Sequence, residues 1–266
     1  MLLVIDAGNT NTVLGLYRVD EEGSGGLQAS DGLLAHWRTA TDSERTADEL
    51  AVMVEGFLNL RGYSLDSDLG GLAISSGVPR VTAALREMAD RYMGFKPVVI
   101  EPGVRTGISI LYENPKEVGA DRIANAVGAY DLYGGPTVVV DFGTATTCDA
   151  VSANGEYLGG AIAPGIEISL DALFGRAAAL REVELIEPRS VLGRSTVDSI
   201  RSGTVYGFAA QVDGLCARIE AELGDCTVVA TGGLAELIAP FSERIEYQEP
   251  WLTLHGLRLV YEKNRV

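Results

Sequence analysis

One short motif occurs twice in this chain of 266 residues, and it restricts the possible folds more than any other feature. In each copy an apolar strand ends in an aspartate, and a turn of glycine and hydroxyl residues follows. The first copy is Leu2–Gly15, with Asp6 and Gly8, and the second is Thr137–Thr147, with Asp141. The two aspartates lie about half of the chain apart, so the motif predicts two related halves that each begin with a hairpin.

The first turn has residues suited to binding a metal-bound phosphate. Gly8 allows the backbone to approach a ligand closely, and Asn9 and Asn11 tolerate left-handed turn geometry. Thr10 and Thr12 add hydroxyl donors. The carboxylate before the turn must be solvated, paired or bound to a cation, because burying it bare costs several kcal/mol. An ordinary hairpin uses the same residue types, but the repetition favours two phosphate-handling turns.

The composition argues against several classes of protein. A net charge of −16 argues against a nucleic-acid partner. The lysines are Lys96, Lys116 and Lys263, and none lies in a GxxxxGK[ST] pattern, which excludes a P-loop enzyme. The apolar runs are too short to span a membrane, and the N-terminus enters a strand without the features of a secretory signal. Three cysteines without metal-ligand spacing fit reduced thiols, so we expect a cytoplasmic protein.

The order of predicted elements indicates an α/β protein with a mixed sheet in each half. We expect two domains, residues 1–118 and residues 119–266, and the last helix is able to pack back on the first domain. Besides the two hairpins, the expected strands are Leu33–Arg38, Gly71–Ser75, Pro97–Ile100, Tyr157–Ala163 and Cys226–Ala230. The expected helices are Ala47–Leu60, Pro79–Tyr92, Gly119–Tyr133, Asp198–Leu223, Leu234–Phe241 and Trp251–Tyr261, together with one that follows Pro164-Gly165 and runs through Phe174.

Three connecting segments are interpreted from their residue types. Asp20–Gly32 is acidic and rich in glycine, which predicts an exposed surface insertion. Thr41–Glu44 has the residues of a helix cap ahead of the helix that starts at Ala47. Val191–Arg201 is polar, and we expect a connector there before a long helix that begins near Asp198. No segment has the low complexity of a linker, so we expect the two halves to share an extended interface.

A third glycine turn, Thr231-Gly232-Gly233, ends another apolar strand. Bare backbone at this position leaves room for a flat ring or a sugar, and the helix that follows presents N–H groups at its start. The same tripeptide also suits a tight turn between a strand and a helix. Because it follows two aspartate–glycine turns, we interpret Gly232 and Gly233 as part of a nucleotide site.

A charged pair, Asp121 and Arg122, begins the helix that follows Gly119. Asp121 has the chemistry of a general base that accepts a proton from a hydroxyl attacking a γ-phosphate. Arg122 can grip a carboxylate of the substrate with two hydrogen bonds. The structural alternatives are a helix N-cap for Asp121 and a surface or cap-side ion pair for Arg122.

Together these motifs resemble the type III pantothenate kinases, a family of the acetate-and-sugar-kinase, Hsp70 and actin superfamily. The resemblance runs through the whole chain in the right order. It implies two ribonuclease-H-like halves of the actin-like ATPase fold, each a mixed β-sheet flanked by helices, with the active-site cleft between them. The segments that carry it are Asp6–Asn11, Ser75–Pro79, Gly119–Arg122, Asp141–Thr147, Gly193–Thr196, Thr231–Gly233 and Leu252–Leu257.

The resemblance also implies roles for individual residues. The reaction would be ATP-dependent phosphorylation of pantothenate to 4′-phosphopantothenate, the first step of coenzyme A biosynthesis, with Mg²⁺ on the nucleotide and Asp121 as the proton acceptor. Asp141 would bind a monovalent cation, K⁺ or NH₄⁺. The ATP-binding residues would be Asp6, Ala7, Gly8, Asn9, Thr10, Asn11, Thr12, Val13, Thr144, Gly232 and Gly233, and the pantothenate-binding residues would be Tyr112, Gly119, Ala120, Asp121, Arg122 and Thr196.

Members of this family are homodimers, so the resemblance implies a homodimer here. Two alternatives remain at this stage: a non-enzymatic regulator of transcription on the same fold, and a nucleotide-driven chaperone or phosphatase of the superfamily. Retention of Asp6, Asp121 and Asp141 argues against the regulator. The chain departs from the family pattern in its long Asp20–Gly32 loop and at Gly77 and Cys148, among other small changes.

Overall fold

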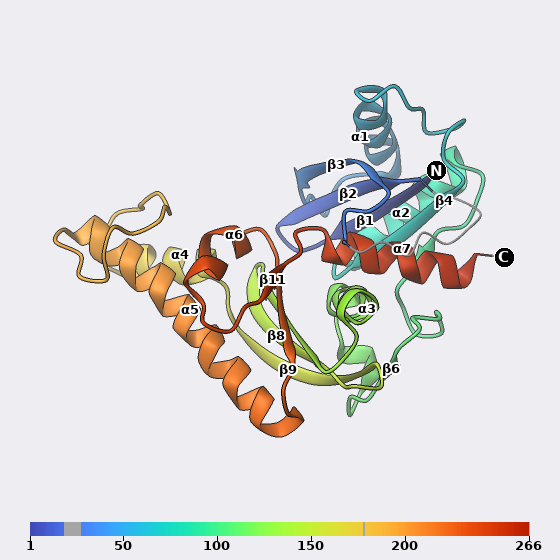
Figure 1. Cartoon of the computed structure of the whole chain (residues 1–266). Coiled ribbons are helices and arrows are strands. Elements are labelled where there is room, and N and C mark those ends of the chain that lie inside the picture. Colours follow the sequence, from blue (N-terminus) through green and yellow to red (C-terminus); the bar gives the residue numbers. More distant parts are fainter. Residues whose placement is uncertain (19–27, 178, 266) are drawn as a thin grey trace. The chain divides into compact units, whose positions relative to one another are not determined.

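The computed structural model describes residues 1–18, 28–177 and 179–265. It divides into two compact units (Figure 1). Unit 1 consists of Met1–Leu132 together with Trp251–Val266, and unit 2 consists of Tyr133–Pro250. The domain division predicted at residues 118 and 119 stays a prediction.

Unit 1 contains a mixed sheet in the order β3-β2-β1-β4-β5. The pairs β1–β2 and β2–β3 are antiparallel, and β1–β4 and β4–β5 are parallel. One face of the sheet packs against α1 and α2 around a core that includes Ile5, Leu14 and Ile74. The bounds are β1 Leu2–Ala7, β2 Asn11–Tyr17, β3 Leu33–Ala40, β4 Gly71–Ser76, β5 Val98–Val99, β6 Ser109–Ile110, α1 Ala47–Asn59, α2 Pro79–Tyr92 and the 3₁₀ turn η1 Pro115–Glu117.

The helix cap predicted at Thr41–Glu44 is wrong. Thr46 is the N-cap of α1: its side chain accepts the N–H of Glu49, and the Glu49 carboxylate accepts the N–H of Thr46 at 2.8 Å. This reciprocal pair is a capping box, which satisfies two backbone donors that would otherwise be unpaired at the helix start. The Thr-x-x-Glu spacing in the sequence identifies it. Thr41 is therefore available for another role, described below.

The opposite face of the unit 1 sheet is covered by α7, Leu252–Asn264, which lies along β1 and β4 (Figure 1, red). Leu254 packs over Gly15, and Tyr261 packs over Gly71. A second helix, α3, Ala120–Tyr133, packs closely against α7, because the Cα of Gly256 lies against the backbone of Ala124. The terminal helix thus packs on both the sheet and α3 within unit 1.

A buried histidine joins these two helices. His255 is fully buried, and its Nε2 lies 3.0 Å from the carboxylate of Asp131 on α3. Its Nδ1 faces the guanidinium of Arg258, which can only donate, so Nε2 carries the proton given to Asp131. This hydrogen bond holds the pKa of Asp131 below its ordinary value.

Unit 2 repeats the arrangement of unit 1. Its strands follow the order β11-β10-β7-β8-β9, with β7–β8 and β8–β9 antiparallel and β10–β7 and β10–β11 parallel. Each strand therefore has a counterpart of the same pairing type in the other unit, which confirms the predicted duplication. The bounds are β7 Thr137–Phe142, β8 Ala145–Val151, β9 Glu156–Pro164, β10 Thr227–Thr231, β11 Tyr247–Gln248, α4 Ile166–Arg176, α5 Thr196–Leu223, α6 Ala235–Ile238 and the 3₁₀ turn η2 Ala239–Phe241.

The core of unit 2 lies between its sheet and α5, where Val205, Val212 and Cys216 are buried. The helix starts two residues before the predicted Asp198, because Ser195 caps it and accepts the Asp198 N–H at 3.1 Å. A hydrogen bond with Cys148 and burial raise the pKa of the Cys216 thiol. The described cysteines are all free thiols, as expected.

Two further predictions concern the Asp20–Gly32 loop and the membrane. Residues 20–27 of the predicted Asp20–Gly32 insertion lie outside the described residues, and Gln28–Gly32 forms turns. Over the described ranges, no helix has the length and apolarity that a membrane span requires.

Candidate active site

The turn between β1 and β2 contains four residues, Gly8 to Asn11, which lie between the paired residues Ala7 and Thr12. It is closed by a hydrogen bond from the N–H of Gly8 to the carbonyl of Asn11, at 3.0 Å. Asn9, Thr10 and Asn11 are exposed. The turn is thus ordered by its own backbone and presents its donor-rich residues at the surface.

Thr41, which follows β3, holds this turn from the carbonyl side. Its N–H donates to the carbonyl of Thr10 at 2.9 Å, and its hydroxyl donates to the carbonyl of Gly8 at 2.7 Å. The same hydroxyl lies 2.8 Å from the hydroxyl of Thr12. Sequence reasoning missed this residue. The register of β3 brings it to the turn, and a hydroxyl residue directly after the third strand is the only signal in the sequence.

The turn between β7 and β8 is shorter, with three residues between the paired Phe142 and Thr146. The N–H of Gly143 donates to the carbonyl of Ala145 at 3.1 Å, and the N–H of Gly165 donates to the carbonyl of Thr144 at 3.2 Å. Gly165 thus takes the place that Thr41 has in unit 1, but it holds the turn with its backbone alone.

Asp141 lies beside the third glycine turn. It pairs with Thr231 across β7 and β10. A Cβ on Gly232 would lie 2.5 Å from Oδ1 of Asp141, and the φ angle of Gly232 is +94°. Only glycine suits this position, because both the backbone angle and the nearby carboxylate exclude a side chain.

Strand β8 carries a buried polar network next to Asp141 of β7. Thr147 is paired with Asp141 across the hairpin, and its hydroxyl donates to the carboxylate of Asp149 at 2.9 Å. The hydroxyl of Tyr157 donates to the other oxygen of Asp149 at 2.7 Å. Asp149 is fully buried. Because the proton of Thr147 is committed to Asp149, the remaining lone pairs of its oxygen are oriented as acceptors beside Asp141.

Two buried hydroxyls have no hydrogen-bond partner within the described part of the chain, those of Ser75 and Thr146. Each side chain is 1% exposed. Leaving a buried hydroxyl without a partner costs about 1–3 kcal/mol, so such groups need an explanation. Ser75 is paired with Asp6 across β1 and β4. Thr146 occupies the position in unit 2 that Thr12 has in unit 1.

Asp121 lies in the first turn of α3 and is exposed. The helix begins at Ala120, and the carbonyl of Gly119 accepts the N–H of Ile123, so Gly119 and not Asp121 is at the cap position. The carboxylate of Asp121 accepts the N–H of Arg122 at 2.9 Å. This leaves the carboxylate at the N-terminus of α3.

Arg122 is buried, whereas one structural alternative placed it in an ion pair at the surface. It is 8% exposed, so the surface ion pair is wrong. A buried guanidinium requires an anionic or strongly polar partner. Tyr112 is half-buried in the segment before η1.

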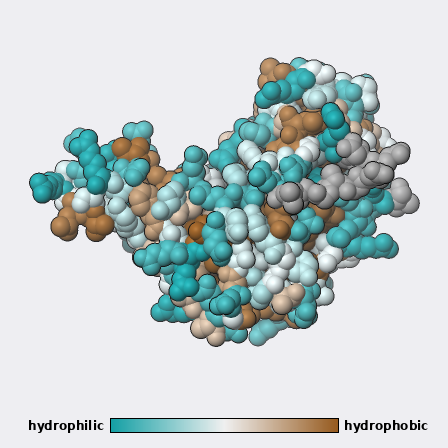
Figure 2. All heavy atoms as spheres, viewed as in Figure 1, coloured by the Kyte–Doolittle hydropathy of each residue, from teal (hydrophilic) through white to brown (hydrophobic). Residues whose placement is uncertain are grey.

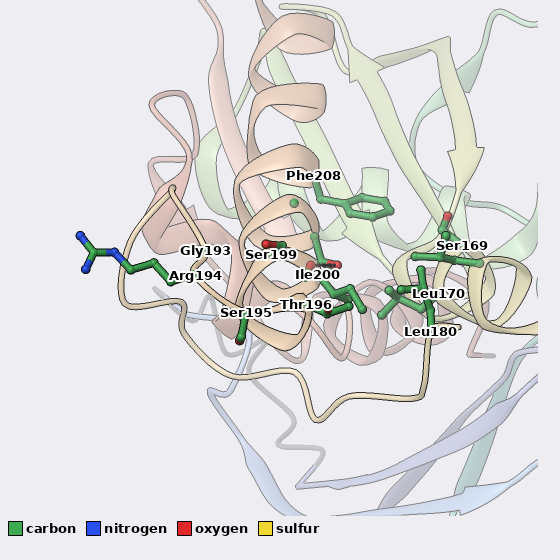
Figure 3. A pocket seen from close by; sticks show the side chains of 13 residues that line it. Ser169, Leu170, Leu180, Gly193, Arg194, Ser195, Thr196, Ser199, Ile200 and Phe208 are labelled. Atoms are coloured by element: carbon green, nitrogen blue, oxygen red, sulfur yellow. Dashed lines mark hydrogen bonds between the residues drawn. The ribbon is translucent and has the colours of Figure 1, made fainter. Parts of the chain in front are cut away.

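Thr196, the first residue of α5, borders a hollow of about 850 Å³ in unit 2. Leu170, Leu180, Ile200 and Phe208 form its apolar wall, and Ser169, Ser195 and Ser199 add hydroxyls. Arg194 points away from the other labelled side chains (Figure 3).

Apolar surface is exposed around the hollow. The residues are Ile168 and Leu173 on α4, Ile186, Val191 and Leu192 in the connector, and Val197 on α5. Figure 2 shows apolar atoms at this end of α4 and α5. A group of this kind on one side of a unit is typical of a contact with another protein surface.

The described residues contain no group of three or more His, Cys, Asp or Glu side chains arranged to hold a metal ion. Asp6 and Asp141 each provide a carboxylate near the end of the central strand of their unit. Mg²⁺ fits such a position, because it usually keeps several waters and binds one or two carboxylates together with substrate phosphates. Asp6 provides a carboxylate of this kind. It lies beside the donor-rich β1–β2 turn and in register with Ser75, whose hydroxyl has no hydrogen-bond partner among the described residues.

Comparisons with known proteins agree with this geometry. Residues 2–218 match the sequence model of the family described as type III pantothenate kinase. The chain is 56% identical to a type III pantothenate kinase of Streptomyces griseus, over 99% of this chain and 98% of the relative. It is 52% identical to that of Thermobifida fusca, over 99% and 100%.

Among solved structures, the activator of 2-hydroxyisocaproyl-CoA dehydratase from Clostridium difficile, with bound ADPNP, is similar in fold. Its TM-score is 0.55 at 12% identity, over 98% of this chain and 93% of that one. This similarity concerns the fold alone, and it agrees with the predicted actin-like ATPase architecture.

Proposed function

Because the chain belongs to the type III pantothenate kinase family, we propose that Asp6, Asp121 and Asp141 carry its reaction. The protein is a kinase that phosphorylates pantothenate with ATP, the first step of coenzyme A biosynthesis. The observation that carries this function is the family match over residues 2–218. The regulatory alternative is not favoured, because the relatives matched over the full chain are kinases.

In this proposal the phosphates of ATP bind the β1–β2 turn. The proposed ATP-binding residues in and beside this turn are Asp6, Ala7, Gly8, Asn9, Thr10, Asn11, Thr12 and Val13. The other proposed ATP-binding residues are Thr144, Gly232 and Gly233. The bonds from Thr41 fix the carbonyls of the turn, so its exposed residues keep one geometry toward the phosphates. Mg²⁺, when bound, neutralises charge on the phosphate oxygens. Asp6 is the residue that would hold it.

Asp121 acts as the proton acceptor. The primary hydroxyl oxygen of pantothenate forms a bond to the γ-phosphorus, the bond from that phosphorus to the β–γ bridging oxygen breaks, and the hydroxyl proton passes to Asp121. The carboxylate is exposed at the start of α3, which makes it accessible to the hydroxyl of a substrate.

Pantothenate is held by the start of α3. The buried Arg122 pairs with the substrate carboxylate, while Gly119, Ala120 and Tyr112 line its path. Thr196 completes the pocket. The exposed apolar residues around Thr196 support the proposal that the enzyme is a homodimer, because a second copy would cover them.

Asp141 binds a monovalent cation, K⁺ or NH₄⁺. The acceptor oxygen of Thr147 beside it and the fixed position of the carboxylate over Gly232 support this role. The residues of the two turns include no lysine, so a cation would supply positive charge there. A cytoplasmic location and the division into domains 1–118 and 119–266 belong to the same proposal.

The test is the variant Asp121→Asn, with Glu113→Gln as a matched control at an exposed acidic residue nearby. ADP release and the mass of the phosphorylated product measure turnover, and calorimetry measures ATP binding. We expect Asp121→Asn to lose about 100-fold or more in turnover while binding ATP as the wild type does. Turnover within a few-fold of wild type would remove Asp121 from the role of base. Failure of the wild type to phosphorylate pantothenate would overturn the function itself.

A further inference from the structure

Ser75 is a buried residue near the end of β4, and the proposed reaction leaves it without a role. Its side chain is 1% exposed, and its hydroxyl has no hydrogen-bond partner within the described ranges. The next residue differs: the hydroxyl of Ser76 accepts the N–H of Val78 at 3.0 Å. One of two adjacent serines is thus satisfied by the local backbone and the other is not.

Register places Ser75 beside Asp6. The two residues are partners in the parallel pair β1–β4, and neighbouring strands are about 4.8 Å apart. Ile5 and Ile74, one position earlier, both face the core shared with α1 and α2. Because side chains alternate along a strand, Asp6 and Ser75 both point to the opposite face. A rotation about χ1 of the serine can therefore direct its proton toward the carboxylate.

The same combination occurs in unit 2. Asp141 is the partner of Thr231 in the parallel pair β7–β10, so each unit sets a hydroxyl in register with the aspartate at the end of its central strand. Thr231 is also 1% exposed. The duplicated fold has kept the pair of functional groups, an aspartate and a hydroxyl residue, although the residue types on the second strand differ.

We propose that Ser75 is a positioning residue for Asp6, donating a hydrogen bond to its carboxylate when the metal–nucleotide complex is bound. This inference depends on the proposed function, in which Asp6 would hold Mg²⁺. A carboxylate that binds a metal is usually itself hydrogen-bonded, since such a bond fixes the orientation of its oxygens. The Ser75 hydroxyl has no other hydrogen-bond partner within the described ranges, and register brings the Asp6 carboxylate beside it.

The experiment compares Ser75→Ala with Ser76→Ala in the full chain. Calorimetry measures the Kd of a non-hydrolysable ATP analogue with and without Mg²⁺, and thermal unfolding measures the Tm of the unliganded protein. We expect Ser75→Ala to weaken the Mg²⁺-dependent binding by about tenfold, to leave metal-free binding unchanged, and to keep or raise the Tm. Ser75→Thr should restore the binding, because Thr231 occupies the equivalent position in unit 2. Ser76→Ala should leave both binding constants unchanged.

Two results would overturn the inference. One is wild-type Mg²⁺-dependent binding in Ser75→Ala. The other is a lower Tm of the unliganded Ser75→Ala with an unchanged effect of Mg²⁺, which would mean a purely structural role. If Ser75→Ala does not fold, Ser75→Cys, which is close to serine in size and a weak donor, decides between the same outcomes. Failure of the wild type to phosphorylate pantothenate would count against the proposed function and leave the binding measurement on Ser75 intact.

Discussion

The β1–β2 turn and the β7–β8 turn come from the same duplicated element, but they are held in different ways. In unit 1 the residue after the third strand is Thr41, which contributes an N–H and a hydroxyl to the turn. In unit 2 the equivalent residue is Gly165, which contributes only its N–H. The backbone bond is common to both units, and in unit 1 the hydroxyl of Thr41 adds a side-chain bond that a glycine cannot make.

The position of the next helix explains the difference. In unit 2, α4 begins at Ile166, directly after Gly165, whereas in unit 1 five residues separate Thr41 from the start of α1 at Ala47. The immediate helix brings the backbone of Gly165 against the carbonyls of Gly143 and Thr144, which leaves no room for a side chain. A shared topology therefore fixes the backbone bond, and the local connection decides whether a side chain can add to it.

The largest effect is expected from Gly165→Ala. The new Cβ would lie 2.6 Å from the carbonyl oxygen of Gly143 and closer still to that of Thr144, both backbone atoms that cannot rotate away. We expect the free energy of unfolding to fall by about 3 kcal/mol, as in overpacked cores, and turnover to fall by about 100-fold because the turn is displaced. Urea unfolding and ADP release measure the two effects.

Gly175→Ala is the matched control, because it lies on the same helix with no atom within 4 Å of its new Cβ. Alanine there should leave stability equal or improve it by about 0.5–1 kcal/mol. If Gly165→Ala behaves like this control, the close packing of the second turn is wrong.

Thr41→Val should have the next largest effect. Valine keeps the shape and the N–H but removes the bonds to the carbonyl of Gly8 and the hydroxyl of Thr12. At about 1 kcal/mol for each bond, the free energy of unfolding should fall by about 2 kcal/mol. The affinity for ATP, measured by calorimetry, should fall with it. Thr41→Ser keeps the hydroxyl and should retain most of the stability and most of the affinity for ATP. Equal losses in Thr41→Val and Thr41→Ser would show that the hydroxyl is not responsible.

Tyr157→Phe tests a second difference between the units. Asp149, which accepts the Tyr157 hydroxyl, lies opposite Val139, and the equivalent residue opposite Val4 in unit 1 is Gly15. Removing one donor from a buried carboxylate should cost about 1.5 kcal/mol in urea unfolding. If the network orients Thr147 toward a cation, the K⁺ concentration for half-maximal turnover should also rise. An unchanged K⁺ dependence would separate the network from the cation site.

Comparison of the two units also explains what the sequence could predict. The aspartate, the glycine and the hydroxyl residues of each turn are adjacent in the chain, so the duplication and the α/β fold follow from one short pattern. Thr41 and Ser75 reach the same region through the register of the third and fourth strands, which the sequence does not specify. The burial of Arg122 depends likewise on packing contacts of α3, and its residue type alone favours the surface.

The smallest effects are expected from Thr12→Val and Thr146→Val, which remove the same hydroxyl from equivalent positions. Thr12 shares a hydrogen bond with Thr41, so its loss should cost about 1 kcal/mol. Among the described residues Thr146 has no partner, because Gly165 lacks the hydroxyl that Thr41 supplies, so valine there should be neutral or stabilise by up to about 1 kcal/mol. Urea unfolding of the two variants decides the matter: equal losses would mean that Thr146 has a partner of its own and that the two turns are held more alike than the hydrogen bonds indicate.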